Sequence, residues 1–281
     1  MLRAKKPEAV TKRLKLFMFG PAGVGKTTAA IQFPNSYIID AEKGTENYDK
    51  LISGSGSVVF QTNDITEVIA EIKSLLTERH DYRTLVIDPI TTIYNDLLDK
   101  CETQVGADFG RHYGAANKIM KRLANLIMAL DMNVVVTAHA KPEYGQNLAK
   151  LGYTFDGWRQ LDYWFDLVVE LGKKGKKRYA RVAKTRLEAF PDDDVFEWNY
   201  DAIKRRYDVN MLEKEATAVR LALPEQVREM KDLLTVVRLP DGTVDKWFAK
   251  AGVDVWEDMP ADVVAKCIQY VKDRLPSNAA A

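Results

Sequence analysis

The chain has 281 residues, of which 46% are hydrophobic and 29% are charged, so it is long enough for one large domain and a smaller one. Its formal net charge of +1 excludes a global attraction to nucleic acid, and any basic surface must be local. The two cysteines lie far apart in sequence, which argues against a disulfide framework or a cysteine-rich zinc site.

After a basic arm over residues 1–13, short apolar runs alternate with helical patterns through residues 14–205. Apolar residues keep helical spacing over residues 65–76 and again over 119–130. This alternation predicts an α/β fold, with a mainly parallel central sheet flanked by helices. The expected strands are Leu14–Phe19, Tyr37–Asp40, Val58–Phe60, Thr84–Asp88, Asn133–Ala138 and Phe165–Leu171.

The pattern changes toward the end of the chain. Tyr179–Val182 and Val195–Trp198 predict a hairpin-like extension with its turn near Pro191. Residues 206–222 are rich in charge and alanine and predict a helical linker, followed by a small helical module over 223–281. This module carries no catalytic constellation, so we expect it to bind a partner. We expect neither a membrane span nor a signal peptide, and a cytoplasmic location.

A P-loop pattern, G-x-x-x-x-G-K-[ST], follows the first predicted strand and precedes a predicted helix that takes in Thr28–Phe33. Glycines let backbone amides surround phosphate oxygens, the lysine reaches the β- and γ-phosphates, and the threonine hydroxyl holds Mg²⁺. The alternative is a glycine turn before an ordinary helix. The expected ATP-binding residues are Gly20, Pro21, Ala22, Gly23, Val24, Gly25, Lys26, Thr27 and Thr28.

Three further strands end in polar residues. Asp88 ends an apolar strand about sixty residues after the P-loop, where a carboxylate supports Mg²⁺. Asp40 and Glu42 follow an earlier strand; Glu42 is a candidate for orienting the attacking water, unless both merely cap the strand. His139 follows a buried strand and could sense the γ-phosphate, although a lone histidine is more often structural.

The order of these motifs over about residues 14–200 resembles the RecA-type recombinase core. The resemblance implies that Glu42 activates water and that His139 occupies the place of a polar sensor, usually glutamine. Residues 108–116 occupy the place of a first DNA-binding loop. Lys184 and Arg186 lie in a stretch similar to a late strand whose basic residues reach the ATP of a neighbouring subunit, so the resemblance implies a ring or filament.

The likeness is closest to compact phage-encoded ATPases with a RecA core, some of which act in single-strand annealing and recombination. Residues from Val236 to the final helix resemble the small helical tails of phage annealing proteins. Such tails are thought to contact single-strand-binding protein, which makes that protein an expected partner. Because the chain lacks the large flanking domains of cellular recombinases, full strand exchange is not implied.

Basic residues interleaved with aromatic ones suit a single-stranded DNA groove, where bases stack on rings between phosphate contacts. Other interpretations stay open: a solvated hairpin for the lysines near residue 175, core packing for the aromatic residues near 160, and a surface turn near 111. The candidate DNA contacts are Arg111, His112, Lys141, Lys150, Arg159, Lys176 and Lys177.

Together these features predict a Mg²⁺-dependent, DNA-stimulated ATPase that binds single-stranded DNA in phage recombination or annealing, in the cytoplasm of the host. A second hypothesis is a nucleotide-switched assembly or loading factor that recruits a replication partner through the C-terminal module. A third is a small-molecule kinase, which the absence of a lid-like arginine cluster disfavours. Single-strand affinity discriminates the first hypothesis from the second, and turnover of a small phosphate acceptor would support the third.

Overall fold

The structure is a computed structural model that describes residues 12–144 and 150–275. Its chain divides into two compact units. The first unit comprises Met1–Val68, Asp81–Ala116 and Asp131–Ala216, and the second comprises Ile69–His80, Asn117–Leu130 and Thr217–Ala281. The predicted arm over residues 1–13 lies almost entirely outside the described residues.

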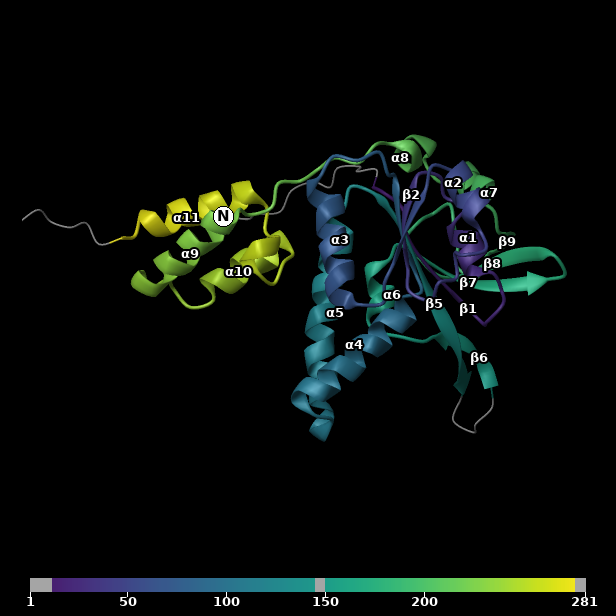
Figure 1. Cartoon of the computed structure of the whole chain (residues 1–281), viewed down its shortest axis with the longest axis horizontal. Helices are drawn as coiled ribbons and strands as arrows, with labels where there is room; N and C mark the ends of the chain where they lie inside the picture. The colour runs from purple at the N-terminus through teal and green to yellow at the C-terminus, as the bar shows by residue number, and fades with distance from the viewer. Residues whose placement is uncertain (1–11, 145–149, 276–281) are drawn as a thin grey trace, which may run out of the picture. The chain divides into compact units, whose positions relative to one another are not determined.

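The first unit is built on a sheet whose described strands run in the order β3-β2-β4-β5-β1-β7-β8-β9, with β6 paired to β5 (Figure 1). All neighbours from β3 to β7 are parallel, while β8, β9 and β6 pair in antiparallel fashion. The predicted α/β fold with a mainly parallel sheet is confirmed. The strands are β1 (Lys15–Gly20), β2 (Ser36–Asp40), β3 (Val58–Gln61), β4 (Thr84–Asp88), β5 (Asn133–Tyr144), β6 (Lys150–Phe155), β7 (Leu167–Lys174), β8 (Lys177–Thr185) and β9 (Val195–Glu197).

Helices connect the parallel strands, and two of them, α3 and α5, begin in the first unit and end in the second. None of the helices within residues 12–144 and 150–275 combines the length and apolar character needed to cross a bilayer. The helices are α1 (Lys26–Ala30), α2 (Asp49–Gly54), α3 (Ile65–Thr77), α4 (Ile90–Val105), α5 (Arg111–Ala129), α6 (Leu161–Trp164), α7 (Tyr200–Arg206), α8 (Val209–Glu213), α9 (Pro224–Val236), α10 (Thr243–Ala251) and α11 (Ala261–Lys272), with 3₁₀ turns η1 (Asp108–Gly110) and η2 (Trp256–Asp258).

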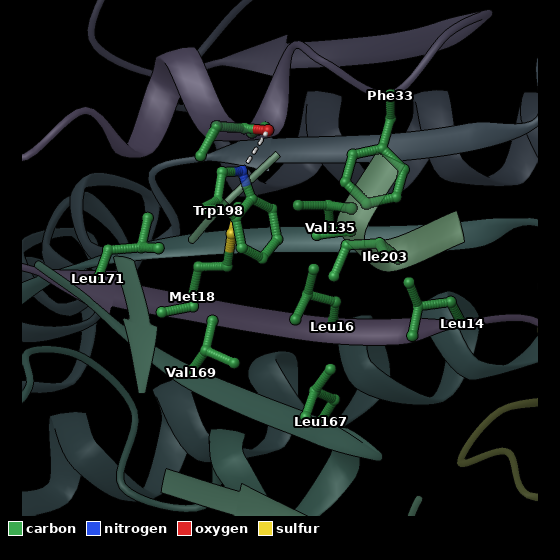
Figure 2. Close-up of a cluster of buried hydrophobic side chains, with 14 of the residues drawn as sticks. Leu14, Leu16, Met18, Phe33, Val135, Leu167, Val169, Leu171, Trp198 and Ile203 are labelled. Atoms are coloured by element: carbon green, nitrogen blue, oxygen red, sulfur yellow. Dashed lines mark hydrogen bonds between the residues drawn. The ribbon is translucent and has the colours of Figure 1, made fainter. Parts of the chain in front are cut away.

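Strand β1 is buried along its whole length, which explains its near-continuous apolar sequence. On one face, Leu16 and Met18 pack in a cluster with side chains of β7 and with Trp198, whose Nε1 donates to the Ala29 carbonyl at 3.4 Å (Figure 2). On the other face, the Phe17 ring meets the Phe155 ring edge-on at 5.1 Å. The P-loop strand is therefore fixed from both sides, which gives the site a rigid base.

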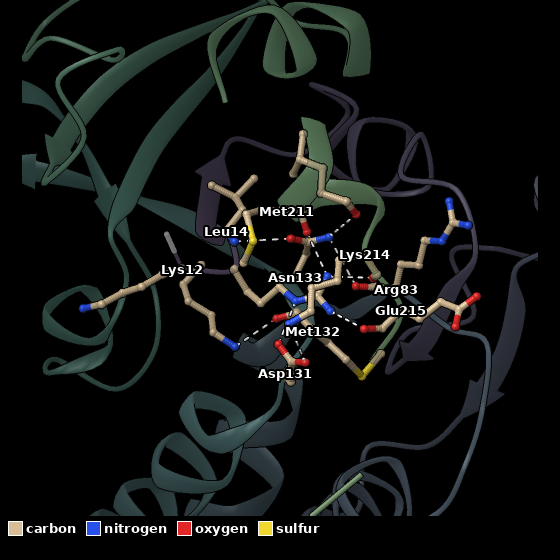
Figure 3. A network of polar contacts seen from close by, with 12 residues as sticks. Lys12, Leu14, Arg83, Asp131, Met132, Asn133, Met211, Lys214 and Glu215 are labelled. Carbon is tan, nitrogen blue, oxygen red and sulfur yellow. Dashed lines mark hydrogen bonds and ion pairs between the residues drawn. The ribbon is translucent and has the colours of Figure 1, made fainter. Parts of the chain in front are cut away.

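A polar network fixes the start of the sheet beneath this core (Figure 3). The side chain of Asn133 accepts from the Leu14 amide at 3.2 Å and donates to the Leu212 carbonyl at 2.8 Å. Arg13 is buried, pairs with Asp131 at 2.9 Å and donates to three carbonyls between residues 211 and 215. The first part of the predicted linker thus packs on the first unit instead of standing free.

The segment after His139 has more regular structure than its sequence indicates. It forms an antiparallel ribbon in which β5 continues to Tyr144 and pairs with β6. The ribbon was missed because residues 141–144 are exposed and include Pro142, so the run shows neither an apolar core nor the usual strand composition. The ribbon extends beyond the carboxyl edge of the parallel sheet (Figure 1).

The second unit contains the three helices predicted for the C-terminal module, α9, α10 and α11, around their own apolar cluster. Among the described residues of this unit, one carboxylate is buried, that of Asp258. It pairs with Arg122 at 2.6 Å and with Lys73 at 2.5 Å. Burial raises the pKa of Asp258, but these two cations outweigh it and the net pKa is lowered. Asp258 thus ties the module to the ends of α3 and α5 within the unit.

Candidate active site

The P-loop lies between β1 and α1 at the carboxyl edge of the sheet. Gly23 and Gly25 have φ angles of +72° and +97°, in the left-handed region that favours glycine. A Cβ on Gly20 would lie 2.7 Å from the Leu171 carbonyl oxygen, so close passage of β7 also requires glycine. Helix α1 has only five residues and ends earlier than predicted, so loop amides rather than a long helix form the anion cradle.

Lys26 lies across this loop. Its ammonium donates to the Gly20 carbonyl at 2.9 Å and to the Pro21 carbonyl at 3.2 Å. Burial lowers the pKa of Lys26, while the nearby carboxylates of Asp88 and Glu42 act in the opposite direction. A half-buried cation facing two carboxylates is the arrangement expected where a phosphate and a metal ion share a site.

Asp88 ends β4 and is 4% exposed. Its carboxylate accepts hydrogen bonds from the hydroxyls of Thr137 and Thr27, yet burial raises its pKa above the ordinary value. The Thr27 hydroxyl and the Asp88 carboxylate are the donor set that Mg²⁺ takes from P-loop proteins, with phosphates and water completing its coordination. The residues present therefore fit a Mg²⁺–nucleotide complex.

Asp40 lies beside Asp88 in the β2–β4 register but has a different environment. Its carboxylate accepts from the amides of Glu42, Gly44 and Thr45 at 2.9–3.1 Å and from the Thr45 hydroxyl at 2.6 Å. Asp40 is thus a positioning residue that holds the loop carrying Glu42. The capping interpretation of the sequence applies to Asp40, whereas Glu42 projects into the site.

Glu42 is fixed by two residues from other elements. Thr92 on α4 donates its hydroxyl to Glu42 Oε1, and His139 Nε2 lies 3.2 Å from Glu42 Oε2. The β1–β5 register places His139 beside Gly20, and the His139 amide donates to Thr91 Oγ1 at 2.9 Å. Thr91 in turn donates to the carbonyl of Asp156, just after β6, at 2.7 Å. Glu42 is thereby linked to the base of the β5–β6 ribbon.

These residues enclose one cavity of about 630 Å³. Most of the predicted ATP-site residues line it, but Val24 points into the core, and Gly20 and Pro21 contribute carbonyls to Lys26 instead. Several lining or supporting residues could not be assigned from the sequence, because only long-range packing and strand pairing bring them here; among them are Tyr48, Thr92, Lys173 and Arg178. Tyr48 contacts the Thr28 hydroxyl at 3.1 Å.

Lys184 and Arg186 do not line this cavity. The Lys184 ammonium donates to the carbonyls of Asp162 at 2.6 Å and Phe165 at 2.8 Å, and burial lowers its pKa. Arg186 donates to the Tyr163 carbonyl at 2.8 Å and pairs with Asp166 at 3.3 Å. Both residues are therefore held by the segment around α6 of their own chain, and their predicted action on a neighbour's ATP stays a prediction.

The candidate DNA contacts fall in four places. Arg111 and His112 belong to the first turn of α5, so they lie on a helix and not in the DNA-binding loop or the surface turn that the sequence suggested. Just before them, Phe109 has φ +54° and is fully exposed. An exposed aromatic ring in a strained turn is a further candidate contact that the sequence did not single out; its sequence signal is the flanking glycine at position 110.

The other candidates lie on the two hairpins or follow β6. Lys141 is on the β5–β6 ribbon and pairs with Asp156 at 3.1 Å, and the side chain of Lys150 lies outside the described residues. Arg159 is exposed after β6, while the nearby Trp158 is buried and belongs to the core. The remaining two lie at the β7–β8 turn, where Lys176 is exposed and Lys177 pairs with Glu197 at 2.7 Å.

Comparisons with known proteins identify a family for this chain. A family model described as an AAA domain matches residues 12–189, whereas no curated protein sequence matches the chain. The structure is similar to the RadB recombinase, with a TM-score of 0.43 and 18% sequence identity over 65% of this chain and 86% of that one. It is also similar to a DnaB-like replicative helicase that interacts with primase, with a TM-score of 0.42 and 13% identity over 66% of this chain and 56% of that one. A third similar structure is the type III secretion ATPase EscN of enteropathogenic E. coli, with a TM-score of 0.41 and 11% identity over 93% of this chain and 66% of that one.

Proposed function

The chain belongs to the AAA domain family, and from this premise we propose that it is a Mg²⁺-dependent P-loop ATPase that binds single-stranded DNA in recombination or annealing. The observation that carries the ATPase assignment is the convergence of Lys26, Thr27, Asp88 and Glu42 on one cavity of about 630 Å³. These residues come from three separate strand ends, and no purely structural need explains their meeting.

Each residue has a role in this proposal. Lys26 neutralises phosphate charge, Thr27 and Asp88 hold Mg²⁺, and Glu42 accepts a hydrogen bond from the attacking water and orients it. Bound Mg²⁺ supplies charge neutralisation for the phosphates. His139 and Thr92 fix the Glu42 carboxylate, so the water is held in one orientation.

The DNA part of the proposal is supported by the placement of exposed basic and aromatic groups. The β5–β6 ribbon starts at the wall of the ATP cavity, where His139 contacts Glu42, and continues to Lys141. Phe109 offers a fully exposed ring on which a base can stack. A change in the position of Glu42 on hydrolysis would reach the ribbon through His139 and would couple nucleotide state to DNA affinity.

The test is ATP hydrolysis with and without single-stranded DNA, using Lys26→Ala as the inactive control. The proposal predicts Mg²⁺-dependent hydrolysis that DNA stimulates and that the Lys26→Ala variant lacks. Hydrolysis without stimulation or DNA binding would reject the DNA part. Mixing Lys184→Ala or Arg186→Ala chains with Lys26→Ala chains tests assembly, because trans action predicts partial recovery of activity.

A second candidate function, a nucleotide-switched loading factor, is favoured by a feature of the C-terminal module. An apolar groove of about 410 Å³ lies between α10 and α11 and is lined by Trp247, Val263, Cys267 and Tyr270, among others. We take residues 223–281 as the interaction module, with single-strand-binding protein as the expected partner. Partner capture by the wild-type chain without any single-strand affinity would support this function over annealing.

A further inference from the structure

Two cations of the β7–β8 hairpin line the ATP cavity. Lys173 on β7 and Arg178 on β8 are directly cross-strand neighbours in the antiparallel register, and both line the cavity. Directly opposite residues project from the same face of a hairpin, and like charges in such a pair repel each other. An anion bound near both side chains would relieve this repulsion.

The register explains why these two side chains face the P-loop. Two residues closer to the core on each strand, Leu171 lies opposite Ala180, and both belong to the buried cluster that includes residues of α1. Lys173 and Arg178 are two residues farther along, so they share the face of that buried pair. Arg178 reaches so far over the loop that a Cβ on Gly25 would lie 2.0 Å from its Nε.

Arg178 also lacks the partners that its neighbours have. On the same hairpin, Lys177 pairs with Glu197, and Arg181 pairs with Glu170 and Asp193. Among the described residues, no carboxylate forms an ion pair with Arg178, and its buried Nε has no hydrogen-bond partner. A buried guanidinium nitrogen without an acceptor is unfavourable unless a ligand supplies one.

We propose that Arg178 is a nucleotide-binding residue that contacts the phosphates of ATP bound to the P-loop of its own chain, with Lys173 beside it. This inference rests on the proposed ATP site and adds a contact that the P-loop pattern does not contain. The guanidinium fork can donate two parallel hydrogen bonds to phosphate oxygens from the side of the loop facing the hairpin.

The test measures the dissociation constant of Mg²⁺–ATP by calorimetric titration of the full chain. Arg178→Gln should raise the dissociation constant about 10- to 100-fold, the range for a lost charge-assisted hydrogen bond. Lys174→Gln is the matched control, because Lys174 is an exposed cation of the same hairpin on the opposite face and should leave the constant within about twofold. Arg178→Lys should recover part of the affinity, since it restores the charge without the fork.

A folding control accompanies the titration. Without nucleotide, Arg178→Gln should have a melting temperature at or above that of the wild type, because the substitution removes an unpaired buried nitrogen. The increase in melting temperature on adding Mg²⁺–ATP should be smaller in this variant than in the wild type. ATP binding within twofold of wild type in Arg178→Gln, together with loss of binding in Lys26→Ala, would overturn the role of Arg178 alone. Absence of ATP binding in the wild-type chain would overturn the ATP site and the inference together.

Mixing distinguishes a contact within one chain from one supplied by a neighbour. Arg178→Gln chains have an intact Lys26, and Lys26→Ala chains have an intact Arg178. A contact within one chain predicts that a mixture hydrolyses subsaturating ATP no faster than Arg178→Gln alone. Recovery toward the wild-type rate in the mixture would overturn the assignment to the same chain.

Discussion

The two buried carboxylates at the carboxyl edge of the sheet should respond in opposite ways to the same substitution. Asp40 and Asp88 lie side by side in the β2–β4 register and are 1% and 4% exposed. The Asp40 carboxylate accepts four hydrogen bonds from the loop that carries Glu42, whereas Asp88 accepts from two threonine hydroxyls. We therefore expect the first carboxylate to stabilise the fold and the second to act on a ligand.

The magnitudes follow from these partners. Asn at position 40 cannot accept on both of its terminal atoms, so Asp40→Asn should lose about 3 kcal/mol of unfolding free energy through two weakened charge-assisted bonds. Asn at position 88 can still accept from a hydroxyl, and it removes a buried charge. Because burial raises the folded-state pKa of Asp88, its ionisation opposes folding, and the stability that it costs grows as pH rises from the unfolded-state pKa toward the folded-state pKa. Asp88→Asn should therefore gain about 1–2 kcal/mol.

The assay is thermal melting at pH 7.5 with and without Mg²⁺–ATP. For a chain of this size, each kcal/mol of unfolding free energy shifts the melting temperature by about 2–4 °C. Asp40→Asn should therefore melt about 6–12 °C lower than the wild type, and Asp88→Asn about 2–8 °C higher. Nucleotide at about 100 times its dissociation constant adds about 2.7 kcal/mol to the wild type, and Asp88→Asn should lose the Mg²⁺-dependent part of this gain. Shifts of the same sign in both variants, or an unchanged Mg²⁺–ATP response in Asp88→Asn, would refute the reasoning.

Three further predictions concern other parts of the chain. Burial lowers the pKa of Lys15 to about 7, so this residue makes the free energy of unfolding rise with pH between about 7 and 10.5. Lys15→Met should lower the slope of unfolding free energy against pH in this range by up to about 1.4 kcal/mol per pH unit, which urea unfolding at several pH values would measure. Phe109→Ala should leave the melting temperature unchanged but weaken single-stranded DNA binding by about 1–3 kcal/mol in fluorescence anisotropy, and unchanged affinity would contradict a stacking role. Asp258→Asn should lower the unfolding free energy by about 2 kcal/mol, whereas the exposed control Asp262→Asn should leave it nearly unchanged in the same denaturation experiment.

Local sequence was sufficient to predict the P-loop and the strand ends that surround it. The pattern from Gly20 to Thr27 has a fixed spacing, and parallel strands bring their carboxyl ends to one edge, so Asp88, Glu42 and His139 could be grouped before any coordinates. Arg178 could not be found this way. Its position depends on the pairing of β7 with both β1 and β8, a long-range register that no short motif encodes.

The placement of basic residues along β8 separates two roles that the sequence alone could not distinguish. Arg178 and Lys184 are six residues apart on one strand, which corresponds to about 20 Å at about 3.3 Å per residue. Arg178 lies over the P-loop of its own chain, while Lys184 is held by the carbonyls of Asp162 and Phe165 at the far end of the strand. At that separation both cations cannot contact the same phosphate group. Because Lys184 also lies outside the cavity, any action of Lys184 on ATP would be on that of another chain, whereas Arg178 adds a basic contact to that of Lys26 before any assembly.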